Sequence, residues 1–131
     1  MAGRDSIRVI AAVVVRDGRW LLAKRPAHKR HGGLWEFPGG KLEAGETDAQ
    51  AAARELDEEL NVTVVGVGPV LFEQSDPGSP FLIVYRQVEA EGQPAAVEHD
   101  ELRWVTADEA ARLNLAPADA AFVAHMTAKM S

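Results

Sequence analysis

Three glutamates in one short segment are spaced so that their side chains could bind a metal ion together. Glu55, Glu58 and Glu59 stand at positions i, i+3 and i+4, which places their carboxylates on one side of a helix. Like charges at this spacing repel one another, and Arg54 could balance only one of them. Carboxylate and carbonyl oxygens are the ligands that Mg²⁺ prefers. The spacing therefore indicates either a divalent-metal site or a solvated acidic helix face.

The segment around these glutamates predicts a glycine turn followed by a helix. Thr47 and Gln50 have the spacing of a capping box, which marks the first turn of a helix. The predicted buried face recurs at spacings of three and four and consists of Ala49, Ala53, Leu56 and Leu60. The glycines of the turn 38–40 would let backbone carbonyls and a substrate approach closely. This turn favours the metal site over the acidic face.

The whole stretch resembles the signature of the Nudix hydrolases, which cleave nucleoside diphosphates linked to another moiety. The matching positions are Gly40, Glu46, Arg54-Glu55-Leu56, Glu58-Glu59 and Val62. The family usually has glycine where this chain has Asn61, and asparagine is the next-best residue for the left-handed backbone expected after a helix. The resemblance implies an α/β fold: a Nudix α/β/α sandwich with a mixed sheet, a catalytic loop-helix and C-terminal helices.

A divalent-metal site follows from the same resemblance, with Mg²⁺ as the cofactor and Mn²⁺ as a substitute. The implied ligands are the backbone of the glycine turn and four carboxylates: Gly39, Gly40, Glu55, Glu58, Glu59 and Glu98. Glu98 lies just upstream of a predicted strand that includes Trp104, where the MutT-like enzymes have an acidic residue that completes the metal site. Glu101 is the alternative match, and an ordinary polar loop is the simpler interpretation of both.

The resemblance also suggests how the catalytic residues divide the work. The expected catalytic residues are Arg54, Glu55, Glu58, Glu59 and Glu98. Glu55 or Glu98 is the better candidate for the general base, whereas Glu58 and Glu59 are better as ligands. Arg54 is expected to orient a carboxylate such as Glu46.

Substrate contacts are expected before and after this signature. The basic loop 24–33 could meet a triphosphate opposite the metal, and Arg25 matches an arginine that contacts substrate in MutT-like enzymes. Residues 34–40 match the segment that lines their nucleobase pocket, with Phe37 at the corresponding place. The expected substrate-binding residues are Arg25, Glu36, Phe37, Pro38, Gly39 and Asp119.

Asp119 bears on the choice of base. An acidic residue in the first turn of a helix is also stabilised by the helix dipole, so its role could be structural. The MutT-like enzymes read the base with asparagine at the corresponding place. An ionised aspartate accepts hydrogen bonds and donates none, which suits the exocyclic amine of cytosine; an oxidised guanine would require a protonated Asp119 or another partner for O6. The stretch 115–119 resembles the branch that hydrolyses CTP more than the branch that hydrolyses oxidised guanine nucleotides.

The rest of the chain predicts a sheet that holds these segments. Residues 7–15 are almost continuously apolar and β-branched, as in a strand covered on both faces. With residues 20–23 they predict a hairpin over 7–25. Further predicted elements are strands over 34–37, 62–73, 81–85 and 102–105, a short helix ending near Leu113 and a last helix from Pro117.

Length and composition set the outer limits. The 131 residues predict a single domain, 1–131, with no cysteine for a disulfide or a thiolate metal site. No apolar run is long enough to span a membrane, and a net charge of −6 argues against broad nucleic-acid binding. We expect a cytoplasmic protein, a monomer or homodimer, whose partner is a small-molecule nucleotide rather than a nucleic acid or a membrane.

These observations predict a Mg²⁺-dependent nucleoside triphosphate pyrophosphohydrolase. Water would attack a phosphorus directly and release a nucleoside monophosphate and pyrophosphate. The expected substrates are (d)CTP-like nucleotides or modified nucleotides such as 8-oxo-dGTP, which would suit a role in nucleotide pool sanitation. Two alternatives stay open: hydrolysis of another nucleoside diphosphate derivative, such as a nucleotide sugar or a dinucleoside polyphosphate, and a non-catalytic nucleotide-sensing Nudix module.

Overall fold

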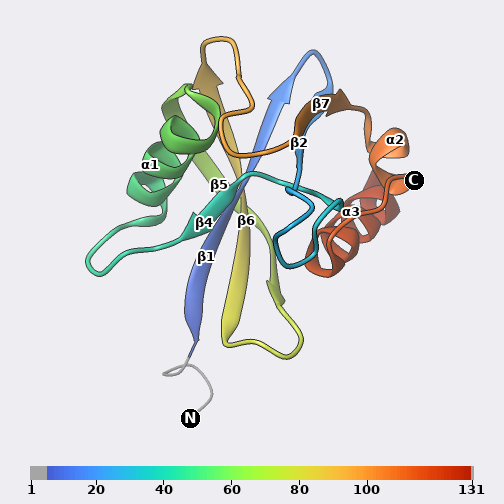
Figure 1. The fold of residues 1–131 in the computed structure, drawn as a ribbon, viewed down its shortest axis with the longest axis horizontal. Helices are drawn as coiled ribbons and strands as arrows, with labels where there is room; N and C mark the ends of the chain where they lie inside the picture. Colours follow the sequence, from blue (N-terminus) through green and yellow to red (C-terminus); the bar gives the residue numbers. More distant parts are fainter. Residues whose placement is uncertain (1–5, 131) are drawn as a thin grey trace.

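A mixed β-sheet forms the centre of the molecule, with one helix on one side and two on the other (Figure 1). The computed structural model describes residues 6–130. Its elements are β1 (Ile7–Arg16), β2 (Arg19–Lys24), β3 (Trp35–Glu36), β4 (Gly39–Lys41), α1 (Asp48–Leu60), β5 (Thr63–Ser75), β6 (Phe81–Glu91), β7 (Glu101–Val105), α2 (Ala107–Ala111) and α3 (Pro117–Met130). The expected α/β fold with a mixed sheet is confirmed.

The strands β1 and β2 part soon after the turn that joins them. They pair only at Val15 with Trp20 and at Arg16 with Arg19. Beyond that point β1 pairs in parallel with β6 and antiparallel with β4, whereas β2 pairs with β3 and β7. The predicted hairpin over 7–25 is therefore present only near its turn. The chain segment from β3 to β4 crosses this opening, where the N–H of Ala12 donates to the carbonyl oxygen of Pro38 at 2.8 Å.

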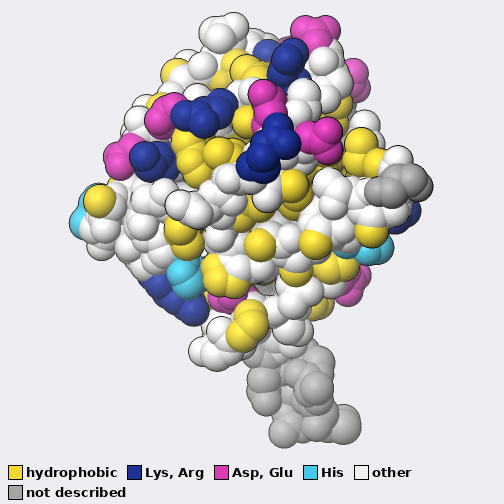
Figure 2. All heavy atoms as spheres, turned by 90° about the vertical axis from the view of Figure 1, so that its right-hand side faces the viewer, with side chains coloured by type: hydrophobic (Ala, Val, Ile, Leu, Met, Phe, Trp, Pro, Cys, Tyr) yellow, Lys and Arg dark blue, Asp and Glu magenta, His cyan; other side chains and the backbone are white. Residues whose placement is uncertain are grey.

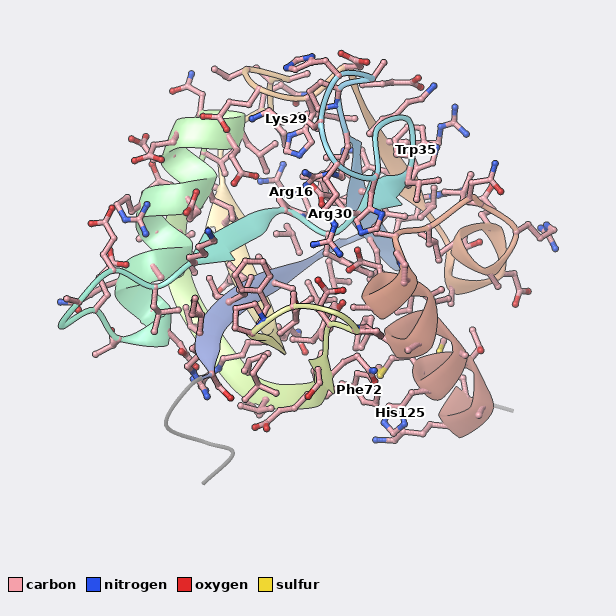
Figure 3. All side chains as sticks on the ribbon, turned by 60° about the horizontal axis from the view of Figure 1, so that its bottom comes forward. Arg16, Lys29, Arg30, Trp35, Phe72 and His125 are labelled. Atoms are coloured by element: carbon pink, nitrogen blue, oxygen red, sulfur yellow. The ribbon has the colours of Figure 1, made fainter. Side chains whose placement is uncertain are left out.

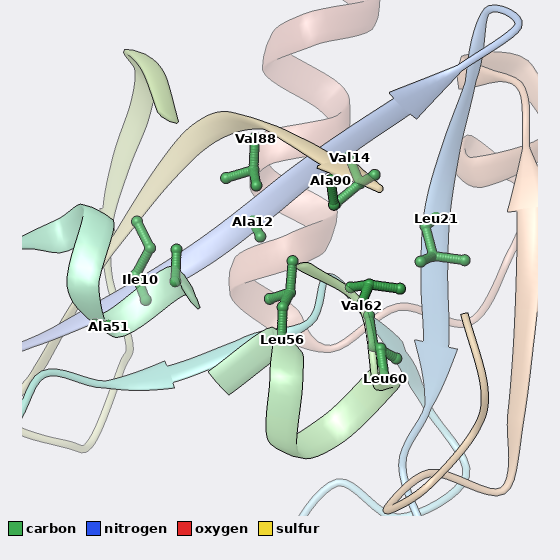
Figure 4. Packing of buried hydrophobic residues seen from close by; sticks show 11 residues of the cluster. Ile10, Ala12, Val14, Leu21, Ala51, Leu56, Leu60, Val62, Val88 and Ala90 are labelled. Atoms are coloured by element: carbon green, nitrogen blue, oxygen red, sulfur yellow. The ribbon is translucent and has the colours of Figure 1, made fainter. Parts of the chain in front are cut away.

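Hydrophobic side chains pack on both faces of the sheet. On one face Leu56 and Leu60 of α1 pack with Ile10 and Val14 of β1, all nearly inaccessible to solvent (Figure 4). The other face holds an aromatic cluster in which the rings of Tyr85 and Phe122 stack. This two-sided burial explains why β1 is apolar along most of its length.

Local sequence patterns place the ends of α1 correctly. Thr47 and Gln50 form both hydrogen bonds of the predicted capping box, and Asn61 adopts the left-handed conformation expected of it, with φ 57° and ψ 41°. The predicted buried face is only half right, because Ala49 and Ala53 are exposed. The buried positions at that end of the helix are Ala51 and Ala52, next to the buried side chain of Asp48.

The side chain of Asp48 links the first turn of α1 to the sheet. Its carboxylate accepts two hydrogen bonds from Arg8 of β1, at 2.7 and 2.8 Å, and one from Arg86 of β6 at 3.0 Å. The Asp48 side chain is 8% exposed, against 40% for Arg8 and 26% for Arg86. Removing one partner of such a buried ion pair leaves the others without compensation. This contact therefore sets the rotation of the helix about its axis.

Replacing Asp48 by asparagine is expected to lower the free energy of unfolding by about 2 kcal/mol at neutral pH, since two guanidinium groups would face a neutral amide. The hydrogen bond from Arg8 lowers the pKa of Asp48 against the effect of burial, and the bond from Arg86 adds to it. A lowered pKa in the folded state gives stabilisation that is complete above the unfolded value of about 3.9 and is lost as pH falls through the folded value.

Urea unfolding at about pH 7 and about pH 3 measures this effect in both proteins. The gap in unfolding free energy should narrow in acid, and an equal gap at both pH values would contradict the assignment. Asp57→Asn is the control, since Asp57 is an exposed acidic residue of the same helix.

The remaining surface adds two observations. Figure 2 shows the side of the molecule that carries α2 and α3, where Lys and Arg side chains lie beside Asp and Glu side chains. Among the described residues of this side the charges are mixed, unlike the basic surface that nucleic-acid binding requires. Within residues 6–130 no helix is long and apolar enough to cross a membrane.

Candidate active site

Arg54 ties the helix α1 to the loop that precedes it. Its Nε and Nη2 donate to the two carboxylate oxygens of Glu46 at 2.7 and 2.9 Å, and Nη2 also donates to the carbonyl oxygen of Lys41 at 3.0 Å. Its Nη1 donates to Oε2 of Glu55 at 3.2 Å. The expected contact between Arg54 and Glu46 is present. These hydrogen bonds lower the pKa of Glu46 to about 2, so Glu46 serves as a permanent anchor for the guanidinium beside Glu55.

Glu55 and Glu59 form a close carboxylate pair against the glycine turn. Glu59 is only 6% exposed, and its Oε1 accepts a long hydrogen bond of 3.4 Å from the backbone N–H of Gly39. The Glu55 carboxylate lies directly against Gly40, where a larger residue would overlap it. Burial, followed by the hydrogen bond and charge of Glu55, raises the pKa of Glu59 well above its usual range. A buried carboxylate whose charge is disfavoured by burial and by a neighbouring carboxylate suits a hard divalent cation.

The other predicted ligands lie farther from this pair. The Glu58 side chain is half exposed, and its Oε2 lies 3.7 Å from Nη1 of Arg54. Glu98 is exposed, yet it lines the same cavity as Glu59 and Gly39. In the described part of the chain no three His, Asp or Glu side chains converge closely enough to hold an ion. The structure thus brings together Glu55, Glu59 and the glycine turn, with Glu98 on the wall of the cavity and Glu58 outside its lining.

That cavity has a volume of about 340 Å³ and is lined by side chains of both charges. Its acidic residues are Glu36, Glu59 and Glu98, and its basic residues are Arg25 and Lys29, with two histidines among them. Lys29 and Arg30 lie on the loop between β2 and β3 (Figure 3). A polyphosphate with a bound cation would match this distribution, because its phosphates need cationic partners and its metal needs carboxylates.

Glu36 stands where this cavity meets a second one. Its Oε1 accepts from Nη1 of Arg25 at 2.9 Å, and its Oε2 lies 2.9 Å from Nε2 of His99. Nε of Arg25 is also held, by a hydrogen bond of 2.6 Å to the carbonyl oxygen of Arg30. Both oxygens of Glu36 are therefore occupied by protein partners, and its place at the site is to hold Arg25. His99 was not predicted, because its contact with Glu36 joins residues 63 positions apart.

The second cavity, of about 370 Å³, is the more apolar of the two, although its lining also includes Arg25, Arg30, His31, Glu36, Lys41 and Asp76. Phe37, Phe81 and Ile83 line it, and Asp119 contributes a carboxylate from the first turn of α3. Arg25, Glu36 and Gly39 line both cavities. An apolar pocket with a few polar groups is typical of a site for a ring such as a nucleobase. Pro38 lines neither cavity and is buried, so the structure assigns it a backbone contact with β1 instead.

Asp119 is 7% exposed, and the Tyr85 hydroxyl donates to its Oδ1 at 2.8 Å. Burial raises the pKa of Asp119 to about 8, helped by the charge of Glu36 and opposed by hydrogen bonds from Tyr85 and the Phe37 backbone and by the charge of Arg25. Tyr85 was not predicted either, since it lies 34 positions from Asp119 along the chain.

Comparison with known proteins agrees with this geometry. A family model described as the NUDIX domain matches residues 6–126. The CTP pyrophosphohydrolase of Escherichia coli K12 is 41% identical over 116 residues, which cover 86% of this chain and 85% of that protein. A Mycobacterium tuberculosis H37Rv protein named "Putative 8-oxo-dGTP diphosphatase 2" is 39% identical over 121 residues, covering 90% of this chain and 86% of that one.

Solved structures show the same relationship. The solution structure of the E. coli ORF135 protein matches with a TM-score of 0.81 and 38% identity, over 96% of this chain and 91% of that one. A MutT structure from work on Aliivibrio salmonicida and Vibrio cholerae matches with a TM-score of 0.80 and 31% identity, over 95% and 98% of the two chains. The loop-helix with its paired glutamates, the two joined cavities and these matches together show that the chain belongs to the Nudix family, as a MutT-like Nudix hydrolase that acts on nucleotides.

Proposed function

We propose that the protein is a Mg²⁺-dependent nucleoside triphosphate pyrophosphohydrolase that prefers cytosine nucleotides, with 8-oxo-dGTP as the next substrate. The observation that carries the proposal is the pair of cavities joined at Arg25, Glu36 and Gly39. One cavity is the more apolar and has the Asp119 carboxylate on its wall, whereas the other is lined mainly by charged side chains, Glu59 among them. A nucleotide would place its base in the first cavity and its phosphates in the second.

Nudix hydrolases generally use a divalent cation, and the oxygen donors present here fit one. Glu55, Glu59 and a backbone carbonyl of the glycine turn would hold it, with Glu58 and Glu98 completing the set. When bound, such a cation screens the phosphate charge and lowers the pKa of a coordinated water. Mg²⁺ is the expected ion because hard oxygen ligands suit it, and Mn²⁺ would substitute.

The remaining steps belong to the protein's own residues. Arg25, held in place by Glu36, is positioned to bind a phosphate between the two cavities. The attacking water must give a proton to a base within hydrogen-bond reach, and Glu55 or Glu98 is our candidate. Arg54 keeps the Glu55 carboxylate oriented through the hydrogen bond described above. Attack on a phosphorus then releases a nucleoside monophosphate and pyrophosphate.

The choice of base rests on Asp119 and on the names of the relatives. The E. coli relative is named for CTP and the M. tuberculosis relative for 8-oxo-dGTP. An ionised Asp119 would accept a hydrogen bond from the cytosine amine, whereas a protonated one would donate to a carbonyl of oxidised guanine. Clearing such nucleotides from the pool of free triphosphates would place the enzyme in the cytoplasm.

Incubation with Mg²⁺ and a panel of nucleotides, followed by chromatography of the products, tests the proposal. We expect nucleoside monophosphate and pyrophosphate from dCTP and 8-oxo-dGTP, and no turnover after chelation of the metal. Release of orthophosphate would contradict the cleavage position. Cleavage of nucleotide sugars or dinucleoside polyphosphates in preference to all triphosphates would contradict the substrate class.

A further inference from the structure

The Tyr85 hydroxyl approaches Asp119 from behind the wall of the apolar cavity. Asp119 lines that cavity, whereas Tyr85 does not. The Tyr85 ring is fully buried and stacks on Phe122, with ring centres 4.4 Å apart and planes 3° from parallel. The Phe37 ring lies nearly perpendicular to the Tyr85 ring, with the two ring centres 5.9 Å apart. A ring packed in this way cannot turn aside, so its hydrogen bond of 2.8 Å to Oδ1 of Asp119 is a fixed part of the pocket.

The direction of this hydrogen bond is also fixed. Burial, together with the charge of Asp119, raises the pKa of Tyr85 far above its usual value. The phenol therefore keeps its proton and acts as the donor, and Oδ1 of Asp119 acts as the acceptor. The backbone N–H of Phe37 also donates to the Asp119 carboxylate. Because each carboxylate oxygen can accept more than one hydrogen bond, Oδ2 keeps acceptor capacity for a base that enters the cavity.

We propose that Tyr85 is a positioning residue that sets base preference through Asp119: its hydroxyl occupies Oδ1, so that Oδ2 is the oxygen that faces the base. When Asp119 is ionised, the pocket then selects bases that carry an amino group at this place, such as cytosine, over bases that carry a carbonyl there, such as uracil. This inference rests on the proposed function, because it assumes that the apolar cavity receives the base.

An asparagine at position 119 makes the role of Tyr85 visible. The Tyr85 donor would require the amide oxygen of Asn on its side, so the NH₂ group would face the base. The group offered to the base would change from acceptor to donor, and the preference should change from amine to carbonyl. Without the Tyr85 hydroxyl only the Phe37 N–H would favour one orientation of the amide, so this preference should weaken.

Protonation gives a second, independent consequence. While the Tyr85 hydroxyl donates to Oδ1, a proton taken up by Asp119 goes to Oδ2, where it turns the acceptor into a donor. The charged neighbours are Glu36 of β3, which raises the pKa of Asp119, and Arg25 beyond the end of β2, which lowers it. The preference for an amino base should therefore rise as pH increases through about 8.

The test compares dCTP with dUTP, which differ at the base in having an amine or a carbonyl. Wild type, Tyr85→Phe, Asp119→Asn and the double variant are assayed for kcat/KM on both substrates at about pH 9, above the pKa of Asp119. We expect wild type to favour dCTP about tenfold or more, and Asp119→Asn to favour dUTP by a similar factor. The double variant should show a ratio closer to one than Asp119→Asn alone. Equal ratios in Asp119→Asn and the double variant would show that Tyr85 only fills space.

A pH series of the kcat/KM ratio for dCTP over dUTP is a second test, because pH effects common to both substrates cancel in this ratio. The dCTP to dUTP ratio should rise through about pH 8 in the wild type. In Tyr85→Phe the rise should move to higher pH, because the hydrogen bond from Tyr85 lowers the pKa of Asp119. A ratio that is flat with pH would overturn the inference.

The design separates this inference from the proposed function. Failure of the wild type to hydrolyse any nucleoside triphosphate would refute the proposed function, and equilibrium binding of dCMP and dUMP would still report the base preference. Efficient hydrolysis with a ratio independent of Tyr85 would refute only the role of Tyr85. Thermal unfolding of each variant checks that the altered ratios come from folded protein.

Discussion

Glu59→Gln is expected to lower kcat at least about 100-fold while the fold is retained. Glutamine has nearly the same shape but lacks the negative charge that a divalent cation requires. The side chain is 6% exposed and its pKa is raised by burial and by Glu55. The charged form is thus unfavourable in the metal-free protein, so a neutral amide should cost little stability there. Steady-state kinetics with Mg²⁺ and circular dichroism measure the two effects.

A binding readout distinguishes loss of the metal from other causes. Mg²⁺ should raise the melting temperature of the wild type, because a ligand that binds only the folded state stabilises it. This increase should vanish in Glu59→Gln and persist in the control Asp57→Asn, which removes an exposed charge from the same helix. Near-normal activity of Glu59→Gln, or an unchanged response to Mg²⁺, would exclude Glu59 as a ligand.

The two glycines of the turn should respond to alanine in opposite ways. A Cβ at Gly39 would overlap the backbone carbonyl of Ile10. The φ of Gly39 is also 150°, a backbone conformation that residues other than glycine rarely adopt. Because the backbone of β1 cannot yield, we expect Gly39→Ala to lose about 3 kcal/mol or more of unfolding free energy. A Cβ at Gly40 would overlap only the Glu55 carboxylate, which can move on its flexible chain.

Gly40→Ala should therefore stay folded and lose activity. Displacing Glu55 would take it from the position next to Glu59 and Arg54, and we expect kcat to fall about tenfold or more. Urea unfolding and steady-state kinetics on the two variants separate the effects. The interpretation would be wrong if Gly39→Ala were as stable as the wild type, or if Gly40→Ala lost stability and kept its turnover.

Features set by neighbours in the chain could be predicted from the sequence. The capping box of Thr47 with Gln50 and the left-handed Asn61 are examples, since both depend on contacts within one turn of helix. The buried face of α1 could be predicted only in part, at Leu56 and Leu60. Its other end is rotated by the ion pairs of Asp48 with two distant strands, which spacing along the helix cannot reveal.

The same limit applies to the site. Of the residues predicted to bind substrate, Arg25, Glu36, Phe37, Gly39 and Asp119 line one cavity, and their roles stay predictions. Pro38 is buried and does not line that cavity, and its role stays a prediction as well. Tyr85 and His99 could not be predicted from the sequence, because each contacts a carboxylate of another element, Asp119 and Glu36 respectively. A tyrosine in an apolar strand is predicted to be a core residue, and only the structure shows that its hydroxyl donates to a carboxylate.

The early parting of β1 and β2 bears on how such an enzyme changes substrate over evolution. It opens a place where the cavity proposed for the base is lined by the loop after β2, the turn after β5 and the start of α3 as well as by β1, β4 and β6, while the paired glutamates come from α1. Relatives named for CTP and for an oxidised guanine nucleotide are 41% and 39% identical to this chain. We expect substitutions in these loop segments and at the start of α3 to change the preferred nucleotide while the glutamates of α1 keep their place.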